Sequence, residues 1–178
     1  RKAKAEIGFF DMVGSTDVVK VSAIGIGMRT HAGVAARMFK ALAEKGRFGE
    51  AKELLHEVTK LPLADAEAHY NLGRVCEAQG KLEDAGRSYQ RAVALRPDYT
   101  EAHFNLGNIY HDLGQYAEAR SCYREALRLN PTYSDTHFYL AVTLEKMGQS
   151  HDARPHWRAY RHLAPQGEWV ALAKEFSE

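Results

Sequence analysis

The sequence predicts an all-α solenoid, in which short helix pairs stack side by side, preceded by a short β segment. One stretch recurs three times without a gap, starting at Ala66, Thr100 and Ser134. Within each copy, apolar residues follow the spacing of two short amphipathic helices joined at a glycine. Such a repeat indicates that each copy is one helix pair, which buries its apolar face only against its neighbours.

The matching positions in the three copies hold small, aromatic or helix-ending residues. They are Leu72, Leu106 and Leu140; Gly73, Gly107 and Ala141; Gly80, Gly114 and Gly148; Ala85, Ala119 and Ala153; Tyr89, Tyr123 and Trp157; and Pro97, Pro131 and Pro165. This pattern and its period resemble the tetratricopeptide repeat (TPR). The resemblance implies that the first helix of each pair, helix A, lines a concave groove that binds proteins or peptides.

Composition places the chain among ordinary globular proteins. It has 178 residues, 45% hydrophobic and 26% charged, and a net charge of +1, which favours neither nucleic acid nor an anionic membrane as a partner. No run of 18 apolar residues and no signal-peptide pattern occurs, so we expect a cytoplasmic protein. Cys76 and Cys122 fall inside predicted helices and suit reduced thiols.

The N-terminal part differs from the repeats. Val18–Met28 is rich in β-branched residues and glycine and predicts a strand, and Thr30 or His31 opens a helix. The stretch Glu6–Gly46 resembles the last regulatory (ACT) domain of bacterial aspartokinases. The residues that carry this resemblance are Val19 to Ser22, Gly25 to Arg29, His31 to Ala35 and Ala41 to Gly46. In that family, the loop between the strand and the helix helps to bind an amino-acid effector. By resemblance, the residues of that loop in this chain would be Met28, Arg29, Thr30, His31, Gly33 and Val34.

The resemblance to the ACT domain ends at Gly46, where a helical sequence replaces the strands that the family would continue with. No aspartokinase catalytic domain is present. Going back one repeat from Leu72, Gly80, Ala85 and Tyr89 reaches Met38, Gly46, Ala51 and Leu55. We therefore expect an ACT-like helix to serve as helix A of a hybrid repeat, as a natural gene fusion or a laboratory chimera would produce.

These observations divide the chain into a β segment, four helical units and a cap. A C-terminal apolar face of Trp169, Leu172, Ala173 and Phe176 predicts the cap, which the last open unit of a stacked array requires. Pro155 is expected near the start of its helix, where a missing N–H costs little. The predicted divisions are 1–31 (ACT-like β segment), 32–65 (hybrid unit), 66–99, 100–133 and 134–167 (TPR units) and 168–178 (capping helix).

The predicted strand has no sheet of its own to join, and a free strand edge is generally avoided. It could pair with residues 7–13, or pair with its counterpart in a second molecule, or be partly disordered or lie against the repeats. Pairing of the strand with its counterpart in a second molecule would form the most hydrogen bonds. We therefore expect a homodimer built on residues 1–31.

Nine side chains are candidates for the groove that the TPR resemblance implies. Asparagine amides both donate and accept hydrogen bonds, so they suit a peptide backbone, while aromatic rings offer apolar contact. Packing of these aromatic rings between helices is an equally good interpretation. The candidates are Tyr70, Asn71, Arg74, Phe104, Asn105, Asn108, His111, Phe138 and Tyr139.

Two more specific sites are rejected. The carboxylate clamp of some TPR proteins matches at only one position in either frame, Asn105 or Asn71, and acidic residues replace its lysine, so we expect neutral or basic partners. His69, His103 and His137 occupy one position in three units, about 10 Å apart, too far to share a metal ion that needs its nitrogens within about 2.1 Å. We expect these histidines to pack, and no metal or cofactor to bind.

No HExxH, CxxC, P-loop or GxSxG pattern occurs, so no catalytic site is predicted. The predicted function is therefore non-catalytic binding of a protein or peptide. The alternative is an effector-sensing or dimerising module derived from an aspartokinase ACT domain.

Overall fold

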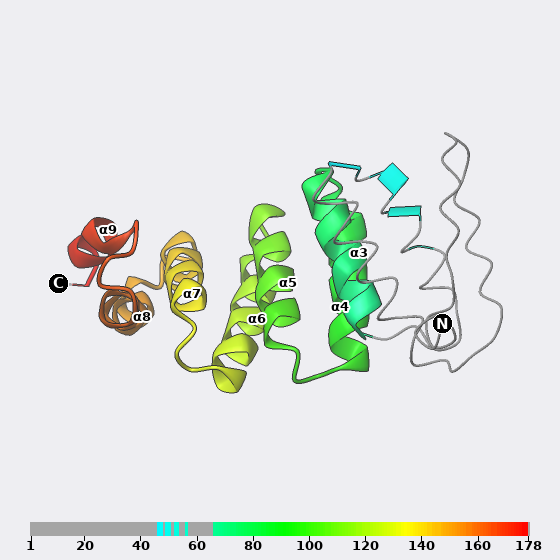
Figure 1. Cartoon of the computed structure of the whole chain (residues 1–178). Helices are drawn as coiled ribbons and strands as arrows, with labels where there is room; N and C mark the ends of the chain where they lie inside the picture. The colour runs from blue at the N-terminus through cyan, green and yellow to red at the C-terminus, as the bar shows by residue number, and fades with distance from the viewer. Residues whose placement is uncertain (1–45, 48, 51, 54–55, 57–65, 178) are drawn as a thin grey trace, which may run out of the picture.

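The computed structural model describes residues 46–47, 49–50, 52–53, 56 and 66–177, and these residues form helices and turns without a strand. The predicted all-α solenoid is confirmed for this part of the chain. The predicted β segment, the effector loop and the dimer contact fall on residues 1–31 or just beyond, outside the described residues. The helices are α3 (Ala66–Ala78), α4 (Leu82–Leu95), α5 (Thr100–Asp112), α6 (Tyr116–Leu129), α7 (Ser134–Lys146), α8 (Ser150–Leu163) and α9 (Val170–Glu175). Figure 1 shows them stacked in a row in chain order.

A glycine ends the first helix of each pair. Gly80, Gly114 and Gly148 have φ values of 71°, 74° and 70°, in the left-handed region that residues with a Cβ rarely adopt. The residue after each glycine donates its N–H back into the helix, as in Gln115 N to Tyr110 O at 2.8 Å. This is the Schellman arrangement, which satisfies helix-end carbonyls and turns the chain sharply into the second helix.

The core forms where the two helices of a pair meet. A Cβ placed on Gly107 would lie 2.5 Å from Cε1 of Tyr123, and one on Gly73 would lie 2.5 Å from Cε1 of Tyr89. The glycines of α3 and α5 therefore accept the aromatic rings of α4 and α6. Ala119 on α6 is also fully buried, but the side chain that packs against Gly107 is that of Tyr123.

Two features of the C-terminal unit differ from expectation. The capping helix α9 spans Val170–Glu175 and is shorter than the predicted 168–178, although Ala173 is fully buried as a cap requires. Pro155 is the sixth residue of α8 rather than part of its first turn. Because proline has no N–H, the carbonyl of His151 loses its helical donor there.

The described residues before α3 continue the repeat. Gly46, one repeat before Gly80, has a φ of 68°. Residues 49–50, 52–53 and 56 are helical. Lys52 Nζ lies 3.3 Å from Asp84 Oδ2 at the start of α4, so a helical residue of the preceding unit contacts the first complete unit.

Candidate functional site

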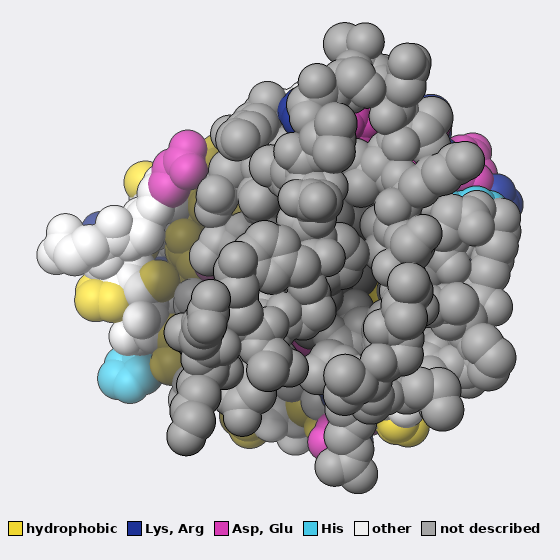
Figure 2. Space-filling view, turned by 45° about the vertical axis from the view of Figure 1, so that its right-hand side comes forward, with side chains coloured by type: hydrophobic (Ala, Val, Ile, Leu, Met, Phe, Trp, Pro, Cys, Tyr) yellow, Lys and Arg dark blue, Asp and Glu magenta, His cyan; other side chains and the backbone are white. Residues whose placement is uncertain are grey.

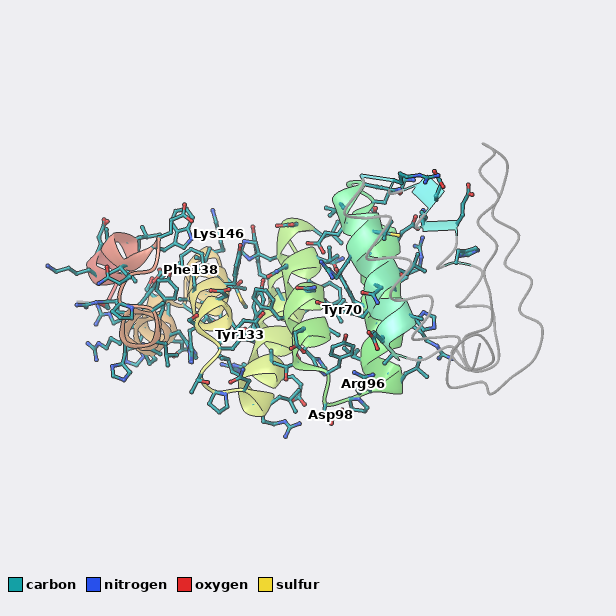
Figure 3. The ribbon with its side chains drawn as sticks, in the orientation of Figure 1. Tyr70, Arg96, Asp98, Tyr133, Phe138 and Lys146 are labelled. Atoms are coloured by element: carbon teal, nitrogen blue, oxygen red, sulfur yellow. The ribbon has the colours of Figure 1, made fainter. Side chains whose placement is uncertain are left out.

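The nine predicted groove residues lie on α3, α5 and α7, and we call the surface that they form the A-helix face. Figure 3 shows that Tyr70 and Phe138 are well separated along the row of helices. Arg74 is exposed and Tyr139 keeps 37% of its surface exposed. Five are half-buried: Tyr70, Asn105, Asn108, His111 and Phe138.

Two of the nine are buried. Asn71 is 7% exposed and Phe104 9% exposed, so neither is available to a partner in this structure. The prediction that Asn71 is solvent-accessible is therefore wrong. Phe104 packs against Tyr133, with ring centroids 5.0 Å apart, and against Tyr139 at 5.7 Å, which supports the packing interpretation for this ring.

Asn105 and Asn108 lie one turn apart on α5 and use opposite ends of their amides. Asn105 Nδ2 donates to the hydroxyls of Tyr70 (3.2 Å) and Tyr89 (3.4 Å). Asn108 Oδ1 accepts from the hydroxyl of Tyr123 at 2.8 Å. Among the described residues, Asn105 Oδ1 and Asn108 Nδ2 have no hydrogen-bond partner. The pair therefore presents one acceptor and one donor side by side.

Aromatic residues outside the helices complete this surface, and sequence reasoning missed them. Tyr99 contacts Tyr70 with a ring distance of 4.8 Å, and Tyr133 contacts Phe104 in the same way. Both close their repeats, so the period of the sequence was an available signal. Trp169 stacks on Phe138 at 5.4 Å and takes this role in the last unit, although it is not at the equivalent position.

The repeated histidines make structural hydrogen bonds. Nε2 of His103 lies 2.9 Å from the carbonyl of Pro97, and Nε2 of His137 lies 3.0 Å from that of Pro131. Each imidazole therefore ties the start of an A helix to the end of the preceding unit. No cluster of three potential metal ligands occurs among the described residues.

His111, a predicted groove residue, is also tied into the structure. Its Nδ1 lies 2.9 Å from Oγ1 of Thr143 on the next A helix, and burial lowers its pKa. A half-buried neutral imidazole that bridges α5 and α7 positions the two helices rather than binding a partner.

Charge is distributed unevenly over the helices. Helix α5 carries Glu101 and Asp112 and no Lys or Arg, whereas α6 carries three arginines and two acidic residues. At the left edge of Figure 2, which is the side of the C-terminal helices in Figure 1, acidic side chains lie close to hydrophobic ones. A negatively charged helix favours cationic partners.

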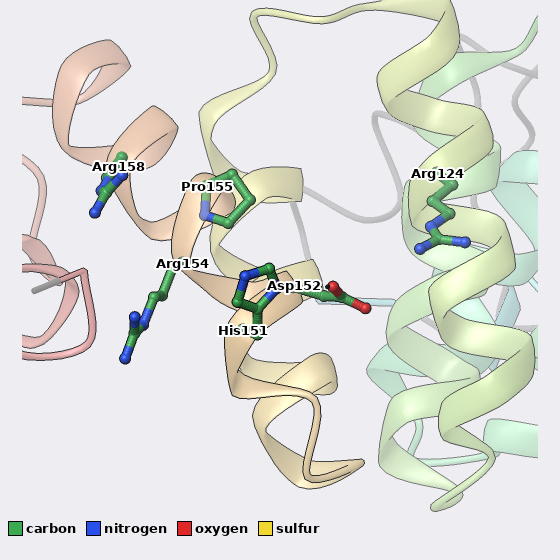
Figure 4. A pocket seen from close by; sticks show the side chains of 6 residues that line it. All are labelled: Arg124, His151, Asp152, Arg154, Pro155 and Arg158. Carbon is green, nitrogen blue, oxygen red and sulfur yellow. Dashed lines mark ion pairs between the residues drawn. The ribbon is translucent and has the colours of Figure 1, made fainter.

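A surface hollow of about 440 Å³ lies between α6 and α8, away from the A-helix face. Arg124 lines it from α6, while His151, Pro155 and Arg158 are among its residues from α8 (Figure 4). The side chains of Arg154 and Arg158 point away from Arg124, so the positive charges do not converge on one point.

Comparison with known proteins now identifies the fold. The TPR repeat model matches residues 73–114 and 107–148. These residues are tetratricopeptide repeats. The structure resembles MamA (TM-score 0.71, 22% identity, 76% of this chain and 79% of that one). It also resembles YrrB, described as a TPR protein with an unusual peptide-binding site (TM-score 0.72, 22% identity, 82% and 76%). At this identity the likeness shows the fold alone.

The N-terminal part has different relatives. The ACT domain model matches residues 21–47. The aspartate kinase Ask_LysC of Stutzerimonas stutzeri is 56% identical over 41 residues, and the aspartate kinase of Pseudomonas fluorescens 60% over 40 residues. These matches cover 23% and 22% of this chain but only 10% of each kinase. The predicted resemblance to the ACT domain is confirmed, and it covers a small fragment of those enzymes.

The repeat-model match and the two similar structures together show a TPR fold for the repeats. Within the described part of the chain, no helix has both the length and the apolarity that a membrane crossing requires.

Proposed function

We propose that the chain binds an extended segment of a protein or peptide along its A-helix face, without catalysis. The observation that carries this proposal is the amide pair of Asn105 and Asn108. One amide keeps an acceptor and the other keeps a donor, a turn apart on the same helix. An extended peptide backbone offers the complementary donor and acceptor at each residue.

The surroundings suit such a ligand. Tyr139, more than a third exposed, and the exposed Arg74 flank the two amides along the face. Tyrosine supplies a large contact area at low entropic cost. The buried Asn71 and Phe104 support the face from below instead of contacting the partner.

The test begins with decapeptides selected from a random display library against the full chain. Replacing Asn105 and Asn108 together by Ala is expected to weaken binding about 30-fold, since each of the two lost hydrogen bonds is worth about 1 kcal/mol. Fluorescence anisotropy measures the affinity, and circular dichroism checks that the helix content is retained.

The matched control is Ser121→Ala, which truncates an exposed polar side chain on α6, away from the A-helix face. Its affinity is expected to equal that of the parent chain. Equal binding by the double variant and the parent would place the ligand elsewhere and refute the proposal.

The match of residues 21–47 to the ACT domain supports a second candidate function, sensing of an amino-acid effector. Isothermal titration of the full chain with lysine and with threonine tests it. Saturable heat that disappears when Arg29 is changed to Ala supports a sensor, and the absence of heat with both amino acids removes this candidate.

A further inference from the structure

An exposed aromatic surface lies at the α7 end of the A-helix face, where Trp169, just before α9, packs beside it; we call this the α7–α9 end. Tyr139 is 37% exposed and Trp169 44% exposed. Phe138 lies between them, with its centroid 5.3 Å from the ring of Tyr139 and 5.4 Å from that of Trp169. Exposed rings grouped in this way favour binding of a partner.

The ring of Tyr139 is held in a fixed orientation. Phe104 and Phe138 meet it edge to face, with interplanar angles of 68° and 87°, and Tyr123 stacks near it at 6.3 Å and 27°. A ring that its neighbours already position loses little entropy when a ligand stacks on it.

The charges around this ring are acidic. Asp135 lies one helical turn before Tyr139 on α7, and Glu168 adjoins Trp169 in sequence. Burial raises the pKa of the Tyr139 hydroxyl, and Asp112, Asp135 and Glu168 raise it further. None of these three carboxylates forms an ion pair with another described residue. The site therefore attracts a cation.

The opposite end of the same face shows how such a ring is used. The guanidinium of Arg74 lies 6.0 Å from the ring centroid of Tyr70, and that of Arg96 lies 4.5 Å from that of Tyr99. In the last unit, two repeats further along the chain, the position of Arg74 is taken by Val142. Among the described residues, arginines therefore lie over tyrosine rings at the α3–α5 end of the face, and none does so at the α7–α9 end.

We propose that the α7–α9 end of the A-helix face binds an arginine of an extended basic peptide segment, with the guanidinium against the ring of Tyr139 and near Asp135 and Glu168. The inference rests on the proposed function and names the chemistry of its ligand. Arginine fits better than lysine because its flat, weakly hydrated guanidinium stacks on aromatic rings. The acidic rim repels phosphate groups, so the occupant is a peptide and not a nucleic acid or an anionic lipid surface.

The probes are three fluorescein-labelled decapeptides in which serine alternates with arginine, lysine or glutamine. On the full chain, the arginine peptide is expected to bind about threefold more tightly than the lysine peptide and at least about tenfold more tightly than the glutamine peptide.

Tyr139→Ala is expected to weaken binding of the arginine peptide about fivefold, while the affinity of Tyr139→Phe stays within about twofold of the parent because the ring remains. Asp135→Asn is expected to weaken it about threefold at low salt, and Glu118→Gln, the same charge change on α6, is expected to leave it unchanged.

Several results would overturn this inference: equal affinity for the arginine and glutamine peptides, no binding of the arginine peptide, or equal affinity of Tyr139→Ala and the parent. Sedimentation of the parent chain and Tyr139→Ala without peptide tests a second copy as occupant. Self-association that only the parent shows would assign the surface to that copy and also overturn the inference. Failure here leaves the proposed function standing if selected peptides still depend on Asn105 and Asn108.

Discussion

The two ends of the A-helix face share a backbone but differ in chemistry. At the α3–α5 end, Asn105 connects the hydroxyls of Tyr70 and Tyr89 by hydrogen bonds. At the α7–α9 end, the residue equivalent to Asn105 is Tyr139, and Phe138 packs among other rings. The first end is a polar network and the second an aromatic cluster. A repeat therefore sets where side chains stand, while a few substitutions decide what each end can bind.

The largest expected difference between the two ends concerns helix contact. Gly107→Ala would place a Cβ against the buried Tyr123 and is expected to lower the free energy of unfolding by about 3 kcal/mol. At the other end the equivalent residue is already an alanine, Ala141, fully buried. Ala141→Gly is expected to cost only about 1 kcal/mol, the helix propensity of glycine. Urea denaturation measures both, and equal costs would show that the two ends pack alike.

Substitutions at the buried alanines of the second helices are expected to destabilise the chain by the same amount at both ends. Ala85, Ala119 and Ala153 are all fully buried at equivalent positions. Changing any one to Leu should overpack the core and cost about 2 kcal/mol, seen as a lower midpoint in urea. A midpoint that does not change for Ala119→Leu would mean that this site has room which the structure does not show.

The largest sensitivity to acid is expected at the C-terminal end. Burial, then the nearby His137 and Arg124, lower the pKa of His156 to about 4, below the value of about 6.5 expected in the unfolded chain. Between these two values the unfolded chain binds the extra proton. The free energy of unfolding therefore has its full value above about pH 6.5, and it falls by on the order of 2 kcal/mol as the pH drops toward 4.

Denaturation midpoints between pH 7 and pH 4 measure this effect. His156→Gln is expected to flatten the dependence, leaving the smaller slope in the same direction that the lowered pKa of His111 contributes. The equivalent residues in the other two units, Ser88 and Cys122, do not titrate in this range; burial raises the pKa of Cys122 to about 11. The same pH dependence in the His156→Gln variant would assign the effect to another group.

The smallest expected effects come from the buried hydroxyls. Tyr89 donates to a carboxylate oxygen of Glu77 at 2.6 Å, and Tyr123 donates to the amide oxygen of Asn108 at 2.8 Å. Hydrogen bonds to charged acceptors are the stronger kind. Tyr89→Phe is therefore expected to cost about 1.5 kcal/mol and Tyr123→Phe about 1 kcal/mol, measured by the same denaturation. The reverse order would show that Glu77 draws little stability from this bond.

The sequence by itself determined the repeat, because period and turn chemistry are local. The regular recurrence of one pattern predicted helices that begin at Ala66, Thr100 and Ser134, where α3, α5 and α7 start. Gly80, Gly114 and Gly148 predicted the turns, since only glycine readily takes the left-handed conformation that they adopt.

Tertiary structure decided which side chains of the candidate site meet a partner and which meet each other. Helical spacing places Asn71, Arg74 and Asn105 on one face, but burial depends on how neighbouring units cover that face. Asn71 is therefore buried while Arg74 is exposed. Trp169 reaches Phe138 from outside the repeat, a contact that no period encodes because the path of the chain after α8 determines it.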